Sequence, residues 1–373
     1  MKIAMIGHKR IPSREGGVEV VVEELATRLA ALGHQVDVYN RKGKNVADAN
    51  ADLDKRNLKT YKGVRLIRVP TSERRSLNAM VYSVLATIKA LFGRYDVIHY
   101  HAEGPCVMLM LPHLFRIRTV ATIHGLDWQR SKWGGFATRY LLLGEKIAAK
   151  YADEVIVLSR NVQKYFAEKY GREVRYIPNG VSAVERLGAK EITKQYGLTE
   201  GGYILYLARI VPEKGLHYLL EAFRDIDTEK KLVIAGGASH TSEYLEQIKK
   251  IAAKDKRVIM TGFVQGAVLE ELYSNAYVYV LPSDVEGMPL SLLEAMSYGN
   301  CCLTSDIPEC IEVVGTNAEH FEKGNVVDLK NKLVKLCENK TLVEEYRSKA
   351  ASYILKKYHW DTVVEETLKL YHK

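Results

Sequence analysis

The sequence predicts an α/β fold made of two doubly wound domains, each built on a parallel sheet. Three observations support this fold class. Short β-rich runs alternate with segments of helical period, which is the pattern of strands joined by right-handed helical crossovers. The alternation restarts after residues 174–180. The length of 373 residues is also large for one compact core and suits two domains.

In the first half, the expected strands are runs rich in β-branched and aromatic residues. They are residues 2–7, 35–40, 64–70, 96–101, 119–124 and 154–159. Residues 17–33 are expected to form a helix, because apolar residues recur there at helical spacing and Gly33 marks its end. The polar segment 42–62 shows neither period, so we expect it to be the least structured part of the chain.

In the second half, the expected strands are residues 203–209, 231–237, 258–262, 278–283 and 301–305. Residues 341–373 are helical in period with a break near His359 and Trp360, and the last helix is expected to cross back onto the first domain. The predicted domains are therefore 1–172 plus 359–373, and 173–358. Ligands bind beyond the carboxyl ends of strands in such sheets, so we expect two such edges to face a central cleft.

Charge is unevenly divided between the two halves. Residues 1–172 carry 29 Lys and Arg against 16 Asp and Glu, a net +13, whereas residues 173–373 carry 25 against 29, a net −4. This excess indicates an anionic partner for the first domain, although a merely soluble basic surface is the alternative. The sequence shows no zinc finger, aromatic RNP-like signature or basic tail, so the expected partner is an anionic membrane surface or a phosphorylated lipid and not nucleic acid.

The sequence favours a cytoplasmic location. The most apolar run, residues 105–115, is short and broken by Pro112 and His113, so no transmembrane helix is expected. The first ten residues lack the apolar length of a signal peptide. Five cysteines with no C-x-x-C spacing indicate free thiols in a reducing compartment.

The segment "LPSDVEGMPLSLLEAMSYGN" (281–300) places two carboxylates, Glu286 and Glu294, around a Gly-Met-Pro turn. Pro289 suits the first turn of a helix, so Gly287 and Met288 should expose backbone N–H groups at a helix start, which favours an anion. Glu294 lies just over one turn into that helix and would accept hydrogen bonds from hydroxyl groups of the same ligand. Glu286 and Glu294 are alternatively ordinary helix-start and surface acids, but the strand–turn–helix setting favours a site.

Two further turns carry candidate phosphate contacts. Arg209 and Lys214 flank a Pro-containing turn after an expected strand, so both would reach one pyrophosphate; alternatively they are solvated surface cations. Gly16 and Gly17 precede the first expected helix without completing a G-x-G-x-x-G fingerprint. Paired glycines allow backbone amides to approach a phosphate or an acceptor closely, unless they form only a flexible turn.

Three histidines, His99, His101 and His124, lie near strand ends of the first domain. His99 and His101 share one strand face, but no third ligand at metal spacing is evident, so we do not expect a metal site. His124 is expected to contact the transferred group. The D-x-D strings at 52–54 and 225–227 do not follow buried strands and are not expected to be metal–nucleotide sites.

With these contexts in place, the chain resembles the retaining, nucleotide-sugar-dependent glycosyltransferases of family four, which have the GT-B fold. The resemblance covers nearly the whole chain. Its motifs are Gly16-Gly17, His124-Gly125, "VLS" (157–159), "IPNGV" (177–181), "ARIVPEKG" (208–215), "AGG" (235–237), "GFV" (262–264), "PSDVEGMPLSLLEAMSYG" (282–299) and "TSDIPE" (304–309). The opening "IPSREGGVEVVVEEL" (11–25) is similar to the bacterial polysaccharide-assembly branch that includes rhamnosyltransferases.

The resemblance implies a role for each candidate residue. As catalytic groups, Arg209 and Lys214 would hold the donor diphosphate and stabilise the leaving group, His124 would contact the donor sugar, and Glu286 would hold that sugar. The remaining donor-binding positions would contact the phosphate, ribose, base and diphosphate. They are Gly287, Met288, Pro289 and Leu290 at the phosphate, Glu294 at the ribose, Phe263 and Val264 at the base, and Gly16 and Gly17 at the diphosphate.

The resemblance also implies a metal-independent, retaining hexosyltransferase with no cofactor besides its substrate. The donor would be a UDP-sugar by frequency in the family, while a dTDP-sugar would suit the rhamnosyl branch. The acceptor would be a lipid-linked glycan in bacterial surface polysaccharide assembly. Residues 73–94 would form a basic amphipathic helix on the inner membrane face, or simply pack within the domain. Residues 128–135 would form an acceptor or membrane loop. The alternatives are an inactive nucleotide-sugar-binding scaffold, a GT-B epimerase and a sugar-phosphate synthase.

Overall fold

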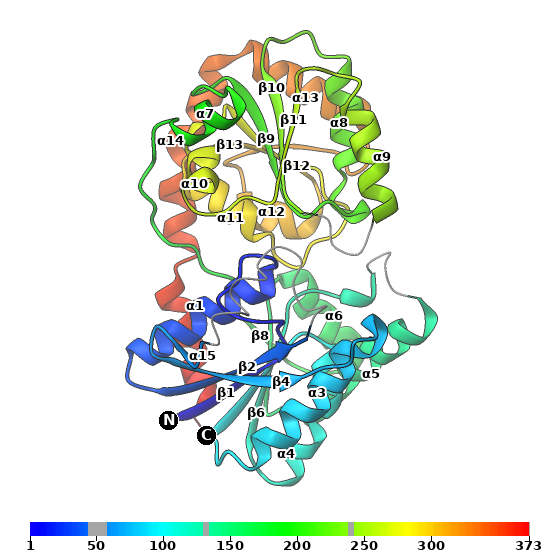
Figure 1. Cartoon of the computed structure of the whole chain (residues 1–373), viewed down its shortest axis with the longest axis vertical. Helices are drawn as coiled ribbons and strands as arrows, with labels where there is room; N and C mark the ends of the chain where they lie inside the picture. The colour runs from blue at the N-terminus through cyan, green and yellow to red at the C-terminus, as the bar shows by residue number, and fades with distance from the viewer. Residues whose placement is uncertain (44–57, 130–133, 238–241, 373) are drawn as a thin grey trace. The chain divides into compact units, whose positions relative to one another are not determined.

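The computed structural model describes residues 1–43, 58–129, 134–237 and 242–372. It divides into two compact units, Met1–Gly180 with Trp360–Lys373, and Val181–His359 (Figure 1). Sequence analysis places the corresponding boundaries at 172/173 and 358/359. Both units are α/β, and the predicted class of two doubly wound parallel-sheet domains is confirmed.

The first unit contains an eight-stranded sheet with the order β3-β4-β2-β1-β5-β6-β7-β8. Neighbouring strands are parallel except for the antiparallel pair β3 and β4. The strands are β1 Lys2–Ile6, β2 Gln35–Lys42, β3 Thr60–Tyr61, β4 Val64–Pro70, β5 Val97–His101, β6 Arg118–Ile123, β7 Glu154–Val157 and β8 Arg175–Tyr176. Because β1 lies between β2 and β5, the direction of strand addition reverses at this point, which is where ligands bind in such sheets.

Helices cover this sheet and bury its apolar side chains (Figure 1). They are α1 Gly17–Ala31, α3 Arg75–Leu91, α4 Met110–Leu114, α5 Gly135–Tyr151, α6 Arg160–Tyr170 and α15 Trp360–Tyr371, with 3₁₀ turns η1 Gly104–Met108 and η2 Asp127–Gln129. The predicted helix 17–33 is α1, which buries Val22, Leu25 and Leu29 at helical spacing. It ends before Gly33, whose φ of 87° allows the chain to turn toward β2.

The second unit contains a six-stranded parallel sheet with the order β11-β10-β9-β12-β13-β14. Its strands are β9 Tyr203–Leu207, β10 Lys231–Ala235, β11 Val258–Gly262, β12 Val278–Leu281, β13 Cys301–Ser305 and β14 Glu319–Phe321. Its helices are α7 Glu191–Tyr196, α8 Leu216–Arg224, α9 Ser242–Ala252, α10 Ala267–Asn275, α11 Leu290–Ser297, α12 Pro308–Val314, α13 Val326–Glu338 and α14 Lys340–Lys357, with η3 Pro212–Lys214. The first strand, β9, lies between β10 and β12, so the order reverses beside it.

The strands that sequence analysis did not predict are short ones at the edges of the sheets, β3, β8 and β14. Two or three residues are too few to show an alternating pattern, and their pairing depends on a neighbouring strand. Several predicted strands end earlier in the structure, because their last residues turn into the loops that follow. Of the predicted polar segment 42–62, residues 44–57 lie outside the described part of the chain.

The C-terminal helix α15 packs in the first unit, although it follows the whole second unit in the sequence. In Figure 1 its red ribbon lies beside blue α1, and the two helices are in contact. Arg118 Nε donates a hydrogen bond to the Leu370 carbonyl at 2.7 Å, and the Tyr371 hydroxyl lies 2.7 Å from Nδ1 of the buried His99. The helix therefore supplies a hydroxyl group that pairs with His99, a buried residue of β5.

The Tyr371 contact generates a stability prediction. Tyr371→Phe removes the hydroxyl that pairs with a buried imidazole nitrogen, so it should lower the free energy of unfolding by about 1–3 kcal/mol. Thermal unfolding measures the loss. Tyr353→Phe is the matched control, because its hydroxyl bonds Lys357 at an exposed site. Equal melting temperatures for Tyr371→Phe and the wild type would contradict the structural role of this hydroxyl.

Candidate active site

The loop after β9 is fixed against the end of β12. The Ile210 N–H donates to the Gly237 carbonyl at 3.0 Å, which holds the loop beside β10. Gly215 has a φ of 65°, and a Cβ there would lie 1.8 Å from the Pro282 carbonyl oxygen. Only glycine permits this approach of two backbones. The close packing brings the β9 loop, which carries Arg209 and Lys214, against the end of β12.

The loop after β12 is held from two sides. The Asp284 N–H donates to the Glu213 carbonyl at 2.9 Å, and the Ser305 hydroxyl donates to the Ser283 carbonyl at 2.6 Å. Residues 287–289 are buried, and α11 begins at Leu290. The predicted helix start is therefore correct to within a residue, with Pro289 as the N-cap in an extended conformation.

Lys214 and Glu286 form the ion pair that joins the two loops. The Lys214 ammonium donates to Glu286 Oε1, which also accepts a hydrogen bond from the Ser283 hydroxyl at 2.7 Å. The side chains are only 14% and 7% exposed, so water screens the pair weakly. Glu286 therefore holds the ammonium group in position at the carboxyl ends of β9 and β12.

Tyr273, which lies in α10, orients the carboxylate of Glu294 in α11. The Tyr273 hydroxyl donates to Glu294 Oε2 at 3.0 Å, and the Tyr273 ring stacks on Tyr298 with centroids 5.3 Å apart. Tyr279 pairs with the Ser291 hydroxyl at 2.8 Å. The carboxylate of Glu294 is therefore held in one orientation by Tyr273, whose ring is itself packed against Tyr298.

The ends of β10 and β11 carry glycines and a half-buried aromatic residue. Gly236 has a φ of 148°, and a Cβ there would lie 1.9 Å from the Ala208 carbonyl oxygen, so β10 packs closely against the β9 loop. A Cβ on Gly237 would lie 3.7 Å from Phe263 Cβ. Phe263 and Val264 follow β11 and are both half-buried.

The second unit therefore brings most predicted site residues to one edge of its sheet. Arg209, Lys214, Glu286 and the 287–290 turn follow the adjacent strands β9 and β12, where the strand order reverses. Buried Tyr206 lies among them: burial raises its pKa well above the ordinary value, and the nearby Glu286 charge adds to the shift. The edge combines cations, backbone N–H groups and fixed carboxylates, which can bind phosphates and hydroxyl groups together.

Gly16 and Gly17 lie in the first unit, at the start of α1. A Cβ on Gly16 would lie 2.3 Å from Glu19 Oε2, and Glu19 Oε1 accepts a hydrogen bond from the Lys9 N–H at 2.8 Å. Burial raises the pKa of Glu19, but the Lys9 hydrogen bond and charge lower it overall. An ionised carboxylate therefore sits beside Gly16, while Gly17 is exposed at the first helical position.

His124 belongs to a buried stack of imidazole rings at the ends of β5 and β6. The His99 and His101 rings stack with centroids 4.2 Å apart, and His101 Nδ1 lies 3.1 Å from His124 Nε2. His99 also contacts the Thr122 hydroxyl at 2.7 Å. Burial lowers the pKa of His99 to about 3, and that of His101 well below its ordinary value, so these rings are neutral near pH 7. His124 is itself 8% exposed.

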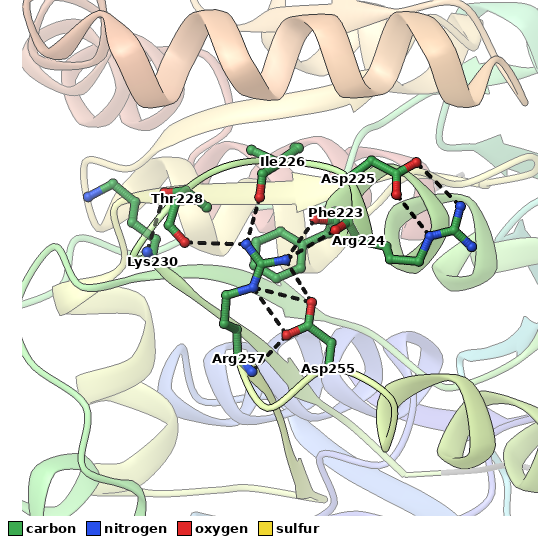
Figure 2. Close-up of polar contacts among 8 residues, drawn as sticks. All are labelled: Phe223, Arg224, Asp225, Ile226, Thr228, Lys230, Asp255 and Arg257. Carbon is green, nitrogen blue, oxygen red and sulfur yellow. Dashed lines mark hydrogen bonds and ion pairs between the residues drawn. The ribbon is translucent and has the colours of Figure 1, made fainter.

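The second D-x-D string, 225–227, lies at the end of α8 (Figure 2). Asp225 forms an ion pair with its neighbour Arg224. Figure 2 shows Arg257 between the backbone of this turn and Asp255: it donates to the Ile226 carbonyl at 2.6 Å and pairs with Asp255 at 2.7 Å. Through these contacts Arg257 holds the turn after α8 against the segment that contains Asp255. Across the described ranges, no group of three His, Cys, Asp or Glu side chains has metal-binding geometry, and the string at 52–54 lies outside those ranges.

Sequence reasoning missed the residues that position the site. Ser283 and Asp284 hold the β12 loop, the Tyr206 hydroxyl donates to the Arg209 carbonyl, and Tyr273 orients Glu294. Among these residues, Ser283 could have been found from the sequence, because it lies only three residues before its partner Glu286. Asp284 and Tyr273 act through partners that are distant in the sequence.

Two family models match the chain in sequence. Residues 15–184 match "Glycosyltransferase Family 4", and residues 189–354 match "Glycosyl transferases group 1". The chain is 26% identical over 311 residues to the GDP-mannose-dependent α-(1-6)-phosphatidylinositol monomannoside mannosyltransferase of Mycolicibacterium smegmatis, covering 77% of this chain and 76% of that protein.

Solved structures share the fold across both units. The sucrose-phosphate synthase of Thermosynechococcus elongatus superposes with a TM-score of 0.83 at 21% identity, covering 99% of this chain and 98% of that one. Anabaena HepE in complex with UDP-glucose superposes with a TM-score of 0.80 at 19% identity, with the same coverage. These similarities confirm the expected GT-B fold.

The imidazole stack generates a pH prediction. His8 also has its pKa lowered by burial, to about 4, and His99 to about 3, whereas unfolded histidines titrate near 6.5. Below pH 6.5 the unfolded chain binds protons that the folded chain does not, so stability falls as the pH drops from 6.5 toward 4 and 3. Each such histidine contributes about 1.4 kcal/mol per pH unit in this window.

Thermal unfolding measures this effect. The melting temperature is followed from about pH 7.5 to about pH 4.5, which is roughly the range in which histidine titrates. His99→Gln should lose less stability than the wild type as the pH falls, because glutamine keeps polar atoms but does not titrate. His320→Gln, at an exposed position, is the control. An acid profile that is the same in His99→Gln and the wild type would show that the stack does not govern acid stability.

Proposed function

The chain is a GT-B glycosyltransferase of the family 4 and group 1 type, and we propose that it moves a sugar, with retention, from a nucleoside diphosphate donor to a lipid-linked glycan. One observation carries the donor side of this proposal. The Lys214 ammonium is held by Glu286 between the ends of β9 and β12, next to the backbone turn 287–290. A diphosphate at this edge would meet a fixed cation and helix-start N–H groups.

The proposed chemistry depends on charge that develops on the leaving diphosphate. Arg209 and Lys214 would stabilise that charge as the bond to the sugar breaks, with the N–H groups of Gly287 and Met288. The acceptor hydroxyl would attack from the face that the leaving group departs, and the departing phosphate would take its proton. In this scheme the protein cations supply the positive charge, so we propose that transfer is metal-independent.

The remaining residues would fix the donor's nucleoside and sugar. Glu294, oriented by Tyr273, would accept hydrogen bonds from the ribose hydroxyls, and Phe263 and Val264 would lie at the base. Glu286 would reach the donor sugar. HepE, which shares the fold, is solved with UDP-glucose, and this supports a UDP-sugar as the first donor to test, with a dTDP-sugar as the second.

The first unit supports a phosphorylated lipid as acceptor. Residues 1–172 carry the net charge of +13, which attracts anionic head groups. The Mycolicibacterium relative is named for a phosphatidylinositol monomannoside acceptor. We propose a lipid-linked acceptor of surface polysaccharide assembly.

Apolar and basic residues at the C-terminal ends of α3 and α4 would place the chain against a membrane. Phe92, Leu114 and Phe115 are 83%, 70% and 67% exposed, and the adjacent Arg94 and Arg116 are exposed cations. Exposed apolar side chains with cations beside them favour an anionic interface. Throughout the described part of the chain, no helix is long and apolar enough to cross a membrane. We propose peripheral association with the inner face.

Replacing either cation tests the diphosphate assignment. Lys214→Ala and Arg209→Ala should each lower kcat by at least about a hundredfold, because each removes a charge that stabilises the leaving group. Transfer from radiolabelled UDP-sugar to a membrane lipid extract gives the rate. Lys249→Ala, which removes an exposed lysine from the same unit, is the matched control. Near-normal transfer by both Lys214→Ala and Arg209→Ala would remove the assignment.

A nucleotide-sugar panel tests the donor. A ligand that binds only the folded chain stabilises it by about 2.7 kcal/mol at a hundred times its dissociation constant. UDP-sugars should therefore raise the melting temperature of the wild type and raise that of Lys214→Ala less. A panel in which no nucleoside diphosphate sugar shifts the melting temperature would contradict the proposed function.

A further inference from the structure

The rings of His101 and His124 meet at the carboxyl edge of the first sheet. His101 is the last residue of β5, and His124 directly follows β6. In the parallel register of these strands His101 lies opposite Thr122, so His124 belongs to the same face of the sheet two residues further on. Strand β5 borders β1, where the strand order reverses and where ligands bind in such sheets.

The position of the His101 ring is fixed by its surroundings. The end of β1 packs tightly against its backbone, because a Cβ on Gly7 would lie 2.0 Å from the His101 carbonyl oxygen. The ring stacks on His99 with centroids 4.2 Å apart. His99 is itself bonded at both ring nitrogens, since the Tyr371 and Thr122 hydroxyls each lie 2.7 Å away. His101 is fully buried, so its ring cannot turn toward water for another partner.

The two ring nitrogens of His101 differ in their partners. Nδ1 lies 3.1 Å from His124 Nε2, whereas the buried Nε2 has no hydrogen-bond partner among the described residues. Burial keeps the pKa of His101 well below its ordinary value, so the ring carries one proton near pH 7. A buried N–H group without an acceptor is costly and rare in folded proteins. The proton of His101 therefore belongs on Nδ1, from which it is donated to His124 Nε2.

His8 follows the same rule, and its proton can be placed from its partner. His8 Nε2 lies 2.9 Å from Asn40 Oδ1. That atom is an oxygen, because it accepts from the Ile11 N–H while Asn40 Nδ2 donates to the Ile11 carbonyl. His8 Nε2 must therefore carry the proton. Its buried Nδ1, which within the described part of the chain has no hydrogen-bond partner, is then the nitrogen with the lone pair.

We propose that His101 is a positioning residue that fixes the tautomer of His124. Because His101 Nδ1–H donates to His124 Nε2, a neutral His124 ring carries its own proton on Nδ1. That Nδ1–H group donates to an oxygen of the transferred sugar and does not accept from it. The inference rests on the proposed function, which supplies the sugar, and it adds a residue that acts on the substrate only through His124.

Nitrogen NMR of the full chain with isotopically labelled histidine tests the tautomer without any need for activity. Spectra are recorded at about pH 8, where an unperturbed imidazole is neutral, and His124→Gln identifies the His124 signals by their loss. Ring-nitrogen chemical shifts distinguish N–H from a lone pair. We expect His124 to be protonated at Nδ1 in the wild type and to lose that preference in His101→Leu. A wild-type His124 protonated at Nε2, wholly or in part, would overturn the proposal, as would an unchanged tautomer in His101→Leu.

Substitutions at His101 test the consequence for transfer. His101→Leu should lower kcat roughly tenfold, about the effect of one neutral hydrogen bond. His101→Asn should recover most of the rate, because its amide nitrogen takes nearly the place of Nδ1 and donates to His124. His101→Gln places its amide nearer Nε2 and should not recover it. His320→Leu, at an exposed position, is the control and should transfer as the wild type does. Equal kcat in His101→Leu and the wild type, or no recovery in His101→Asn, would contradict the positioning role.

UDP binding separates this inference from the proposed function. UDP lacks the transferred sugar, so each His101 variant should bind it as the wild type does, and kcat is expressed per UDP-binding site so that unfolded chain is not counted. A chain with His124 protonated at Nδ1 that binds no UDP would contradict the proposed donor chemistry and leave the tautomer assignment standing. A chain that binds UDP and transfers sugar with His124 protonated at Nε2 would overturn only the role of His101.

Discussion

The ion pair between Lys214 and Glu286 joins two loops that are far apart in the sequence, and the arrangement of the candidate site depends on it. Water screens the pair weakly because both side chains are largely buried. The Ser283 hydroxyl adds a second hydrogen bond to the same oxygen of Glu286. A diphosphate arriving at this edge would share an ammonium group that is already in place, so little side-chain entropy remains to be lost on binding.

Sheet topology explains why these two loops meet. β9 lies between β10 and β12, so the loops after β9 and β12 leave adjacent strands at the point where the order reverses. Gly215 lets the first loop press against the Pro282 carbonyl, and Gly236 does the same for β10 against Ala208. A side chain at Gly215 would separate the β9 and β12 loops and move Lys214 away from Glu286. Backbone packing thus determines where the charges lie.

Sequence patterns predicted the long strands, the helix α1 and the turn at 286–290, because these depend on local periodicity and on glycine and proline. Arg209 and Lys214 could be selected because they follow a buried strand. The edge strands β3, β8 and β14 could not be predicted, because segments of two or three residues are too short to show an alternating pattern. Three contacts could not be predicted either, because each joins residues that only the fold brings together. They are the pairing of Lys214 with Glu286, the contact of Tyr371 with His99, and the hydrogen bond between Asn40 and the Ile11 N–H. The roles of Gly16, Gly17 and His124 remain predictions.

A crystal structure of the full chain with UDP would show whether the ends of β9 and β12 bind the donor's diphosphate. We expect phosphate oxygens within hydrogen-bond distance of Lys214 Nζ and of the N–H groups of Gly287 and Met288, with the ribose at Glu294. A diphosphate bound elsewhere, with Lys214 engaged only by Glu286, would contradict this expectation.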